Sequence, residues 1–480
     1  MINTLSAEKS ATITDSANLI AADTHTPAVN LTGFDTPEGG PHLTQGANKA
    51  NRKKVLSWAF YDWAMQPFNT VILTFVFTAM YLVSDRFVDP AIVASHGLEA
   101  AQARLTSGLG LMTTIAGIAI ALVAPVLGQW ADASGKRKTW LFVATLLQLL
   151  AMASLFFVQA DPRFFWLGAS LVAVGGVLNT IAETNYNAML LGVADKNTMG
   201  RVSGLGWGLG YTAGVVNLLL IAAISFALPD ALGAANGMIF RWIAIGCVIW
   251  ALLFGWPIFR NVPEAPFVEG RQFPGFFAAY RELFRTIRGL FRTNRRTFWF
   301  LISSAIYRDG LSGVFAFGAV IAAVAFGFSA MEVLIFGIAA NLVAGLSTFV
   351  AGRLDDKFGP RRVIIGSLAL LLVAGLLVVV LHAHGSIVFW ILGLILCCTV
   401  GPAQSASRSF LAREIPPGHE AEMFALYATT GKAASFMAPA MWTLSIALTG
   451  ATIWGTLGIM LVIAVGLAMF IFLREPKISN

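Results

Sequence analysis

Among the ionisable side chains inside the long apolar runs of this chain, six are candidates for chemistry. They are Asp62, Glu183, Arg308, Asp309, Arg408 and Lys432. A charged group inside a membrane span costs roughly 2.5 to 3.5 kcal/mol on insertion scales, so each of them needs a partner or a function. Acids in the first half and mainly bases in the second suit a central cavity that binds a zwitterion or an organic anion. The carboxylate of an amino acid could bind one of the bases, and its ammonium group Asp62 or Glu183.

Each of these residues has a structural alternative, a buried pair between helices that only fixes packing. Function is favoured for Asp62, because polar and aromatic residues surround it. Glu183 could carry a proton. Arg408 lies near one end of its run, where it could reach the surface, so we predict a gate or structural role. The predicted solute or proton pathway is therefore Tyr61, Asp62, Trp63, Gln66, Asn69, Glu183, Asn187, Arg308, Asp309 and Lys432.

The composition predicts an all-α polytopic membrane protein. Of the 480 residues, 57% are hydrophobic and 12% charged, against about 25% charged in soluble proteins, and the mean hydropathy is +0.73. A net charge of +7 fits basic cytoplasmic loops better than a nucleic-acid surface. The cysteines Cys247, Cys397 and Cys398 lie within apolar runs, so neither a disulfide framework nor a metal site is expected.

Twelve apolar runs are long enough to cross a membrane. They lie at about 55–83, 106–130, 139–160, 164–192, 201–228, 238–258, 297–323, 328–351, 363–383, 386–411, 422–448 and 452–473. We expect a disordered cytoplasmic tail at 1–50, a six-helix bundle at 51–258, a linker at 259–296, a second bundle at 297–474 and a tail at 475–480. Basic residues gather in alternate loops, which predicts that both termini are cytoplasmic.

The linker carries an amphipathic pattern. Phe276, Tyr280, Phe284, Ile287 and Phe291 fall on one helical face, and Arg281, Arg285, Arg288 and Arg292 on another. The aromatic face favours an interfacial helix whose arginines meet anionic headgroups. A solvated connector helix is the alternative.

A short loop motif occurs twice, about half a chain apart. Its residues are Gly128, Asp132, Gly135, Arg137 and Lys138 in the first copy, and Gly352, Asp356, Gly359, Arg361 and Arg362 in the second. An internal repeat of membrane helices points to a transporter. The offsets of the two halves predict that Asp62 and Asp309 are symmetry mates on spans one and seven.

These loops, between spans two and three and between eight and nine, resemble the major facilitator superfamily (MFS). Residues 57–64, 200–211, 307–310, 407–409, 415–418 and 431–433 narrow the resemblance to the Atg22-like effluxers and their bacterial UMF1 group. The resemblance implies two rocking halves, with the loop motif as a latch on the cytoplasmic side, to which we add Arg408 as a gate residue. A yeast relative is associated with amino acid efflux.

We therefore expect a secondary transporter of an amino acid or similar solute in the inner or plasma membrane, and coupling to a proton is a further hypothesis. An exporter of drugs or peptidoglycan fragments is the first alternative, and a receptor or lipid scramblase of the same fold is the second. No Walker loop follows a strand, and no Ser, His and Asp set stands out, so neither an enzyme nor a cofactor is expected. We expect a monomer whose partners are the solute, protons and the bilayer, not nucleic acid.

Overall fold

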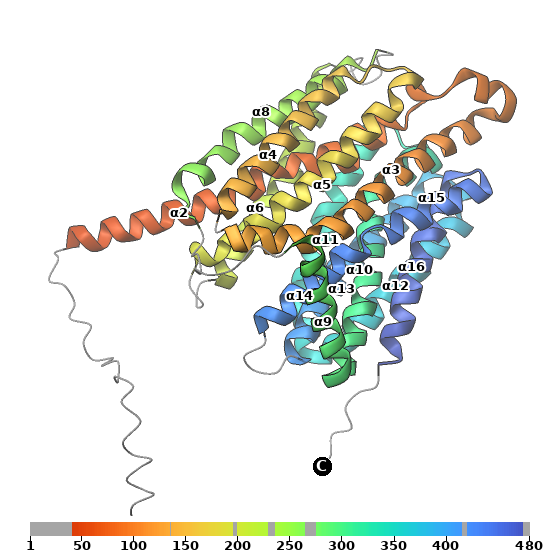
Figure 1. The fold of residues 1–480 in the computed structure, drawn as a ribbon. Helices are drawn as coiled ribbons and strands as arrows, with labels where there is room; N and C mark the ends of the chain where they lie inside the picture. The colour runs from red at the N-terminus through yellow and green to blue at the C-terminus, as the bar shows by residue number, and fades with distance from the viewer. Residues whose placement is uncertain are drawn as a thin grey trace, which may run out of the picture. The chain divides into compact units, whose positions relative to one another are not determined.

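The computed structural model describes residues 41–134, 136–194, 199–228, 236–264, 275–414 and 420–473. Lys53–Asn480 form one compact unit, and its described ranges are almost entirely helical, without a strand (Figure 1). Residues 1–40 of the predicted tail lie outside the described residues. The first helix begins inside that tail, at Pro41.

The described residues of the first half supply six long helical segments. They are α2 (Pro41–Pro67), continued by the π-helical turns η1 (Phe68–Phe75) and η2 (Phe77–Leu82), α3 (Pro90–Ser134), α4 (Arg137–Ser154), α5 (Phe165–Met189), α6 (Met199–Ala227) and α8 (Met238–Asn261). Helix α3 bends at Gly97, whose φ of 83° lies outside the helical range and is tolerated by glycine. Short 3₁₀ turns join several of these helices.

The second half follows the linker helix α9 (Phe276–Thr293). It comprises α10 (Arg295–Val320) with the π-helical turn η7 (Ile321–Ala325), α11 (Ala330–Phe358), α12 (Pro360–Val380), α13 (Ser386–Glu414), α14 (Glu420–Ala434), α15 (Met437–Thr449) and α16 (Gly455–Ile471), with the 3₁₀ turns η8 (His382–His384) and η9 (Thr452–Trp454). The first turn of α11 is closed by a capping box between Ser329 and Glu332.

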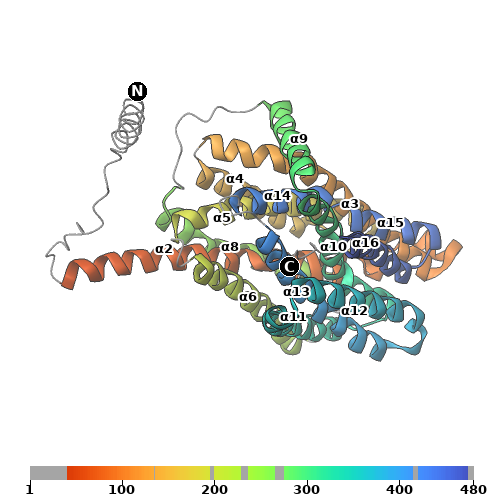
Figure 2. The same cartoon turned by 90° about the horizontal axis from the view of Figure 1, so that it is seen from below.

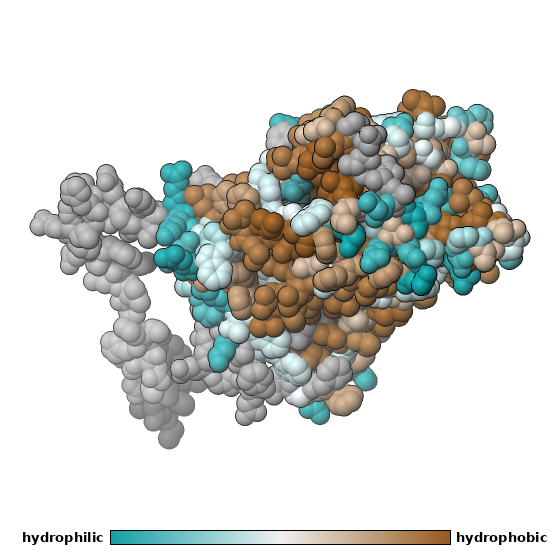
Figure 3. Space-filling model, turned by 90° about the horizontal axis from the view of Figure 1, so that it is seen from above, coloured by the Kyte–Doolittle hydropathy of each residue, from teal (hydrophilic) through white to brown (hydrophobic). Residues whose placement is uncertain are grey.

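Among the described residues, 11 helical segments are long and apolar enough to cross a membrane. Large apolar side chains such as Leu253, Leu346 and Val373 are exposed, and apolar residues cover much of the surface seen in Figure 3. In a soluble protein this exposure would be costly, but lipid tails are as apolar as these side chains.

The predicted run at 422–448 is not one continuous helix. It consists of α14 and α15, which are interrupted at Ser435 and Phe436. Pro439, the third residue of α15, has no N–H to donate, and its ring would clash with the preceding turn if the helix continued through it. The prediction of an unbroken span was wrong here because hydropathy does not detect a break between two apolar segments.

The two halves pack through α3 against α14 and α15, and through α6 against α11. The Thr106 and Thr452 hydroxyls lie 3.0 Å apart, and the Trp442 indole donates to the Thr106 carbonyl at 3.1 Å. A Cβ on Gly117 would lie 2.6 Å from the carbonyl oxygen of Ser435, so this approach of the backbones needs glycine. Thr106 and Thr452 lie near the end where α3 begins, the predicted outer end.

Candidate functional site

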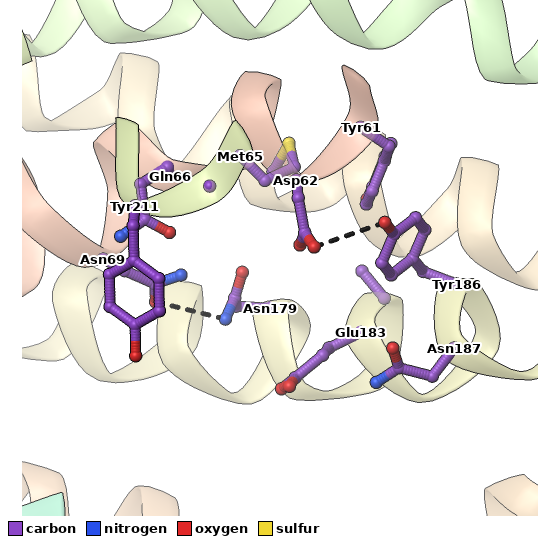
Figure 4. Close-up of a pocket in the computed structure, with 12 residues that line it drawn as sticks. Tyr61, Asp62, Met65, Gln66, Asn69, Asn179, Glu183, Tyr186, Asn187 and Tyr211 are labelled. Carbon is purple, nitrogen blue, oxygen red and sulfur yellow. Dashed lines mark hydrogen bonds between the residues drawn. The ribbon is translucent and has the colours of Figure 1, made fainter. Parts of the chain in front are cut away.

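A cavity of about 300 Å³ opens within the first half of the chain (Figure 4). This volume is at the lower end of the range for small-molecule sites. The walls come from α2, η1, α5 and α6. The lining residues are Tyr61, Asp62, Met65, Gln66, Asn69, Asn179, Ala182, Glu183, Tyr186, Asn187, Gly210 and Tyr211.

The spacing of the polar residues explains why they meet. Asp62, Gln66 and Asn69 are separated by four and three positions, so they share one face of the first span. Asn179 and Glu183 share a face of α5 in the same way. Helix α6 approaches this surface through glycines, because a Cβ on Gly206 would lie 3.2 Å from Asp62 Oδ2.

Asp62 faces the cavity and is held by a tyrosine (Figure 4). The Tyr186 hydroxyl donates to Asp62 Oδ2 at 3.3 Å. The Tyr186 ring stacks on Trp58, with the centroids 4.5 Å apart, and on Tyr61, with the centroids 5.0 Å apart. The Trp58 indole also donates to the Tyr186 carbonyl at 3.1 Å. This aromatic packing fixes the hydroxyl donor, so the carboxylate is oriented by a rigid neighbour.

A chain of amides forms another part of the wall. Gln148 donates to Asn179 Oδ1 at 3.1 Å, and Asn179 donates to Asn69 Oδ1 at 3.3 Å. Gln66 donates to Thr70 at 2.9 Å. Amide side chains offer both donors and acceptors, so this wall can bind either a polar or a charged group of a solute.

One ion pair connects the cavity to the second half of the chain. Lys432 Nζ of α14 lies 3.3 Å from Glu183 Oε2 of α5. The two side chains are 35% and 44% exposed. Pairs as exposed as this contribute about 0 to 1 kcal/mol, so the contact can break and form again easily.

Arg308 lies outside the cavity, on α10. Its guanidinium donates to the Tyr427 carbonyl at 3.1 Å and lies 3.8 Å from the centroid of the Tyr427 ring. A cation over an aromatic face is attracted by the ring quadrupole. Helix α14 thus carries Lys432 and also Tyr427, the residue that holds Arg308 in place.

Asp309 also lies outside the cavity, and only 6% of it is exposed. Its Oδ2 accepts a hydrogen bond from the Ala438 N–H at 2.6 Å. Ala438 belongs to the first turn of α15, whose N–H groups have no partners within the helix. The carboxylate therefore caps the helix that begins at the break in span eleven, and its negative charge is favourable at that end of the helix dipole.

Similar contacts surround one tyrosine in each half. The Tyr61 hydroxyl lies 2.6 Å from Thr145 Oγ1 of α4, the third span, and the Tyr307 hydroxyl lies 2.6 Å from Ser407 Oγ of α13, the tenth span, so these two partners are not equivalent in the repeat. Each tyrosine also meets a phenylalanine of the last helix of its half edge to face, Tyr61 with Phe259 and Tyr307 with Phe470.

The shared contact with the last helix of each half favours an alignment of Tyr61 with Tyr307, in which Asp62 corresponds to Arg308. The pairing of Asp62 with Asp309 stays a prediction.

Comparison with known proteins assigns the chain to a family. Residues 194–479 match the family model described as vacuole effluxer Atg22 like. The chain belongs to this Atg22-like family. The uncharacterized MFS-type transporter YxiO of Bacillus subtilis is 26% identical over 436 residues, which cover 89% of this chain and 96% of YxiO. Autophagy-related protein 22 of Cryptococcus neoformans is 25% identical over 289 residues, 56% of this chain and 49% of that protein.

Solved structures show the same fold. A bacterial homologue of the iron transporter ferroportin in its inward-facing state has a TM-score of 0.61 at 15% identity, over 89% of this chain and 98% of that one. The xylose transporter XylE of E. coli in its inward-open conformation has a TM-score of 0.57 at 14% identity, over 91% and 98%. The Atg22-like chain is therefore a multi-pass membrane transporter of the MFS type, and its family is one of transporters, not of enzymes.

The basic residues of the repeated loops bind helix ends in this Atg22-like transporter. Lys138 Nζ donates to the Val262 carbonyl, at the end of α8, at 2.9 Å. Arg361 donates to the carbonyls of Leu473 and Ile471, at the end of α16, at 2.6 and 2.8 Å. In each half, a basic side chain thus satisfies carbonyls at the C-terminal end of the last helix.

The remaining predicted latch residues are only partly described. Gly135 lies outside the described residues, as do the side chains of Asp132 and Asp356. Gly128 and Asp132 belong to α3, and Gly352 and Asp356 to α11. Gly359 joins α11 to α12 with a φ of 82°, a conformation that favours glycine. Arg137 begins α4, and the side chains of Arg362 and Arg408 are exposed. Asp355, one residue before the predicted aspartate, pairs with Arg413 at 3.2 Å.

The cavity includes some predicted residues and omits others. Tyr61, Asp62, Gln66, Asn69, Glu183 and Asn187 line it. Trp63 instead stacks on Trp250 of α8, with the centroids 5.5 Å apart. Met65, Asn179, Ala182, Tyr186, Gly210 and Tyr211 were not among the predicted site residues. Helical spacing from Glu183 could have identified Asn179 and Tyr186, whereas Tyr211 carries no comparable signal.

Proposed function

We propose that this Atg22-like transporter moves a small zwitterion of the amino acid type by alternating access of its two halves. The observation that carries the proposal is the cavity of the first half, where Asp62 and Glu183 present carboxylates and Lys432 of the second half lies 3.3 Å from Glu183. A site with carboxylates on one side and cations of the second half on the other matches a solute with one ammonium and one carboxylate group.

The ammonium group binds at the acidic wall of the cavity. Asp62 supplies a carboxylate already oriented by Tyr186, and Glu183 supplies a second one. Hydrogen bonds between charged groups are roughly twice as strong as those between neutral ones. An incoming ammonium group competes with Lys432 for Glu183, so binding loosens the pair between the halves.

The carboxylate of the solute binds on the side of the second half. Arg308 is held against the Tyr427 ring, which leaves the planar fork of its guanidinium suited to a carboxylate. Lys432, once released from Glu183, adds a second positive charge. Closure of the halves around the solute brings the two walls together.

Transport is driven by a proton that Glu183 or Asp62 accepts, because both carboxyl groups line the cavity within spans. The transporter acts in the plasma membrane with both termini in the cytoplasm, which the basic loops support. The contact between Thr106 and Thr452 supports a state closed on the outer side.

Counterflow in proteoliposomes tests this function. Vesicles loaded with a mixture of unlabelled amino acids are offered each labelled one in turn, with and without an imposed pH gradient. We expect exchange of at least one zwitterion, a loss of exchange in Asp62→Asn and in Arg308→Gln, and no loss in the control Arg163→Gln, whose side chain is 89% exposed. Folded protein that exchanges an uncharged or purely anionic solute but no zwitterion would contradict the proposal.

A further inference from the structure

Helix α9 occupies a position fixed by its neighbours. It lies between α8 and α10, which both cross the membrane, so it is held near the boundary of the bilayer. It packs against α3 of the first half and α10 of the second, and Figure 2 shows it at the margin of the bundle. The Tyr280 hydroxyl donates to the Leu122 carbonyl of α3. Desolvation raises the pKa of this hydroxyl, so it stays protonated as a donor.

The structure divides the predicted aromatic face of α9 into two. Leu283, Ile287 and Leu290 turn towards the bundle and pack on its core. Phe284, by contrast, is 65% exposed, and Phe277 and Phe291 are 85% and 36% exposed. These three phenylalanines are spaced by seven residues, or nearly two turns, so they form one outward line along the helix.

A line of arginines runs beside the exposed phenylalanines. Arg281, Arg288 and Arg292 are all exposed. At 100° per residue, each of them lies within about a quarter turn of the phenylalanine line. The helix therefore presents, on one side, aromatic rings and cations at neighbouring angles, the pattern of a helix that lies in a membrane interface.

We propose that this surface, formed by Phe277, Phe284, Phe291, Arg281, Arg288 and Arg292, binds the anionic phospholipids of the adjacent leaflet. The rings enter the boundary between headgroups and acyl chains, and the arginines bind the lipid phosphates. Lipid fits better than a protein partner, because the helix is tethered at the bilayer surface and the arginines complement anionic headgroups.

The contacts of α9 give this lipid site a mechanical consequence. The helix is bonded to α3 through Tyr280, and Phe291 also packs against Phe298 of α10, with the centroids 5.1 Å apart. Lipid bound to α9 therefore holds a segment that touches both halves of the transporter. The inference is independent of the solute, so it stands or falls separately from the proposed function.

Quenching of a fluorophore tests the site in the full chain. Phe284→Cys is labelled with bimane in a background with Cys398→Ser, since Cys247 and Cys397 are buried. The protein is reconstituted in phosphatidylcholine with phosphatidylglycerol, and either lipid is supplied in brominated form at the same fraction. We expect brominated phosphatidylglycerol to quench roughly three-fold more strongly, and the preference to fall with added salt.

Matched variants identify the cause of the preference. Replacing Arg281, Arg288 and Arg292 by Gln should make the two lipids equal quenchers, and replacing them by Lys should largely restore the preference. Arg163→Gln should leave it unchanged. A bimane at Phe226, which is 74% exposed near the other end of the bundle, should be quenched by both lipids equally.

Two outcomes would overturn the proposal. Equal quenching by both lipids at position 284 would exclude a selective anionic site. Absence of quenching there, with normal quenching at position 226, would show that α9 faces water, a second copy or another protein.

Discussion

The first span of each half contains an aspartate, and the two aspartates, Asp62 and Asp309, have different surroundings. Asp62 is only partly buried and faces the cavity, with the Tyr186 hydroxyl as a donor at 3.3 Å. Asp309 is 6% exposed and accepts a hydrogen bond at 2.6 Å from the backbone of α15. A carboxylate inside a span can therefore line a binding cavity or cap a helix, and only its surroundings distinguish these two roles.

The difference follows from a break in span eleven, which its equivalent in the first half, α6, does not have. In the second half, span eleven is divided into α14 and α15, which leaves N–H groups of α15 without partners in the helix. In the first half, the equivalent span α6 is continuous beside Asp62, and its glycines leave room for the cavity. In the second half the buried acid Asp309 therefore binds the backbone of α15, and Arg308 is the residue that we propose for the solute.

The largest effect should come from removing the helix cap. We expect Asp309→Ala to lower the free energy of unfolding by about 3 kcal/mol, because it removes a charged hydrogen bond and leaves buried N–H groups unsatisfied. Asp62→Ala should change it by less than about 1 kcal/mol, since Asp62 borders a cavity that water can enter. Denaturant titration of both variants in detergent measures the difference. Equal losses of unfolding free energy in the two variants would show that Asp309 does not have a capping role that Asp62 lacks.

Replacing Asp62 should change transport, whereas replacing Asp309 should change stability. We expect Asp62→Asn to weaken apparent solute affinity by about 10- to 100-fold, the value of a charged hydrogen bond of roughly 1.5 to 3 kcal/mol. Its unfolding should stay near that of the wild type. Counterflow at several solute concentrations measures this. Normal transport with an intact dependence on the proton gradient would remove Asp62 from both proposed roles.

The break in span eleven also forms a contact between the halves. We expect Gly117→Ala to destabilise the closed outer end by about 1 to 3 kcal/mol, since the added Cβ would overpack against the backbone of Ser435 and Phe436. Gly246→Ala is the control, because a Cβ there meets no atom within 4 Å. Spin-label distances across the outer ends of α3 and α15 should broaden only in Gly117→Ala. A similar broadening in both variants would show that the contact is not specific.

The sequence was sufficient for the fold but only partly for the site. Hydropathy located most spans, and helical spacing placed Asp62, Gln66 and Asn69 on one face, because both signals are local. The role of Asp309 could not be predicted, since it depends on Ala438, more than a hundred residues away. The pairing of Asp62 with Asp309 across the repeat stays a prediction, because a shift of one residue exchanges Arg308 for Asp309 and loop lengths do not resolve one residue.

The smallest effect on stability should come from the pair that joins the cavity to the second half. We expect Glu183→Gln and Lys432→Gln each to change the free energy of unfolding by at most about 1 kcal/mol, because both side chains are more than a third exposed. Transport should nevertheless change, since the pair must open for the halves to separate. The exchanged variant Glu183→Lys with Lys432→Glu should recover stability but not solute binding, because it places a cation beside Asp62. Recovery of both properties would show that the pair only fixes packing, and that the acidic wall of the first half does not select the solute.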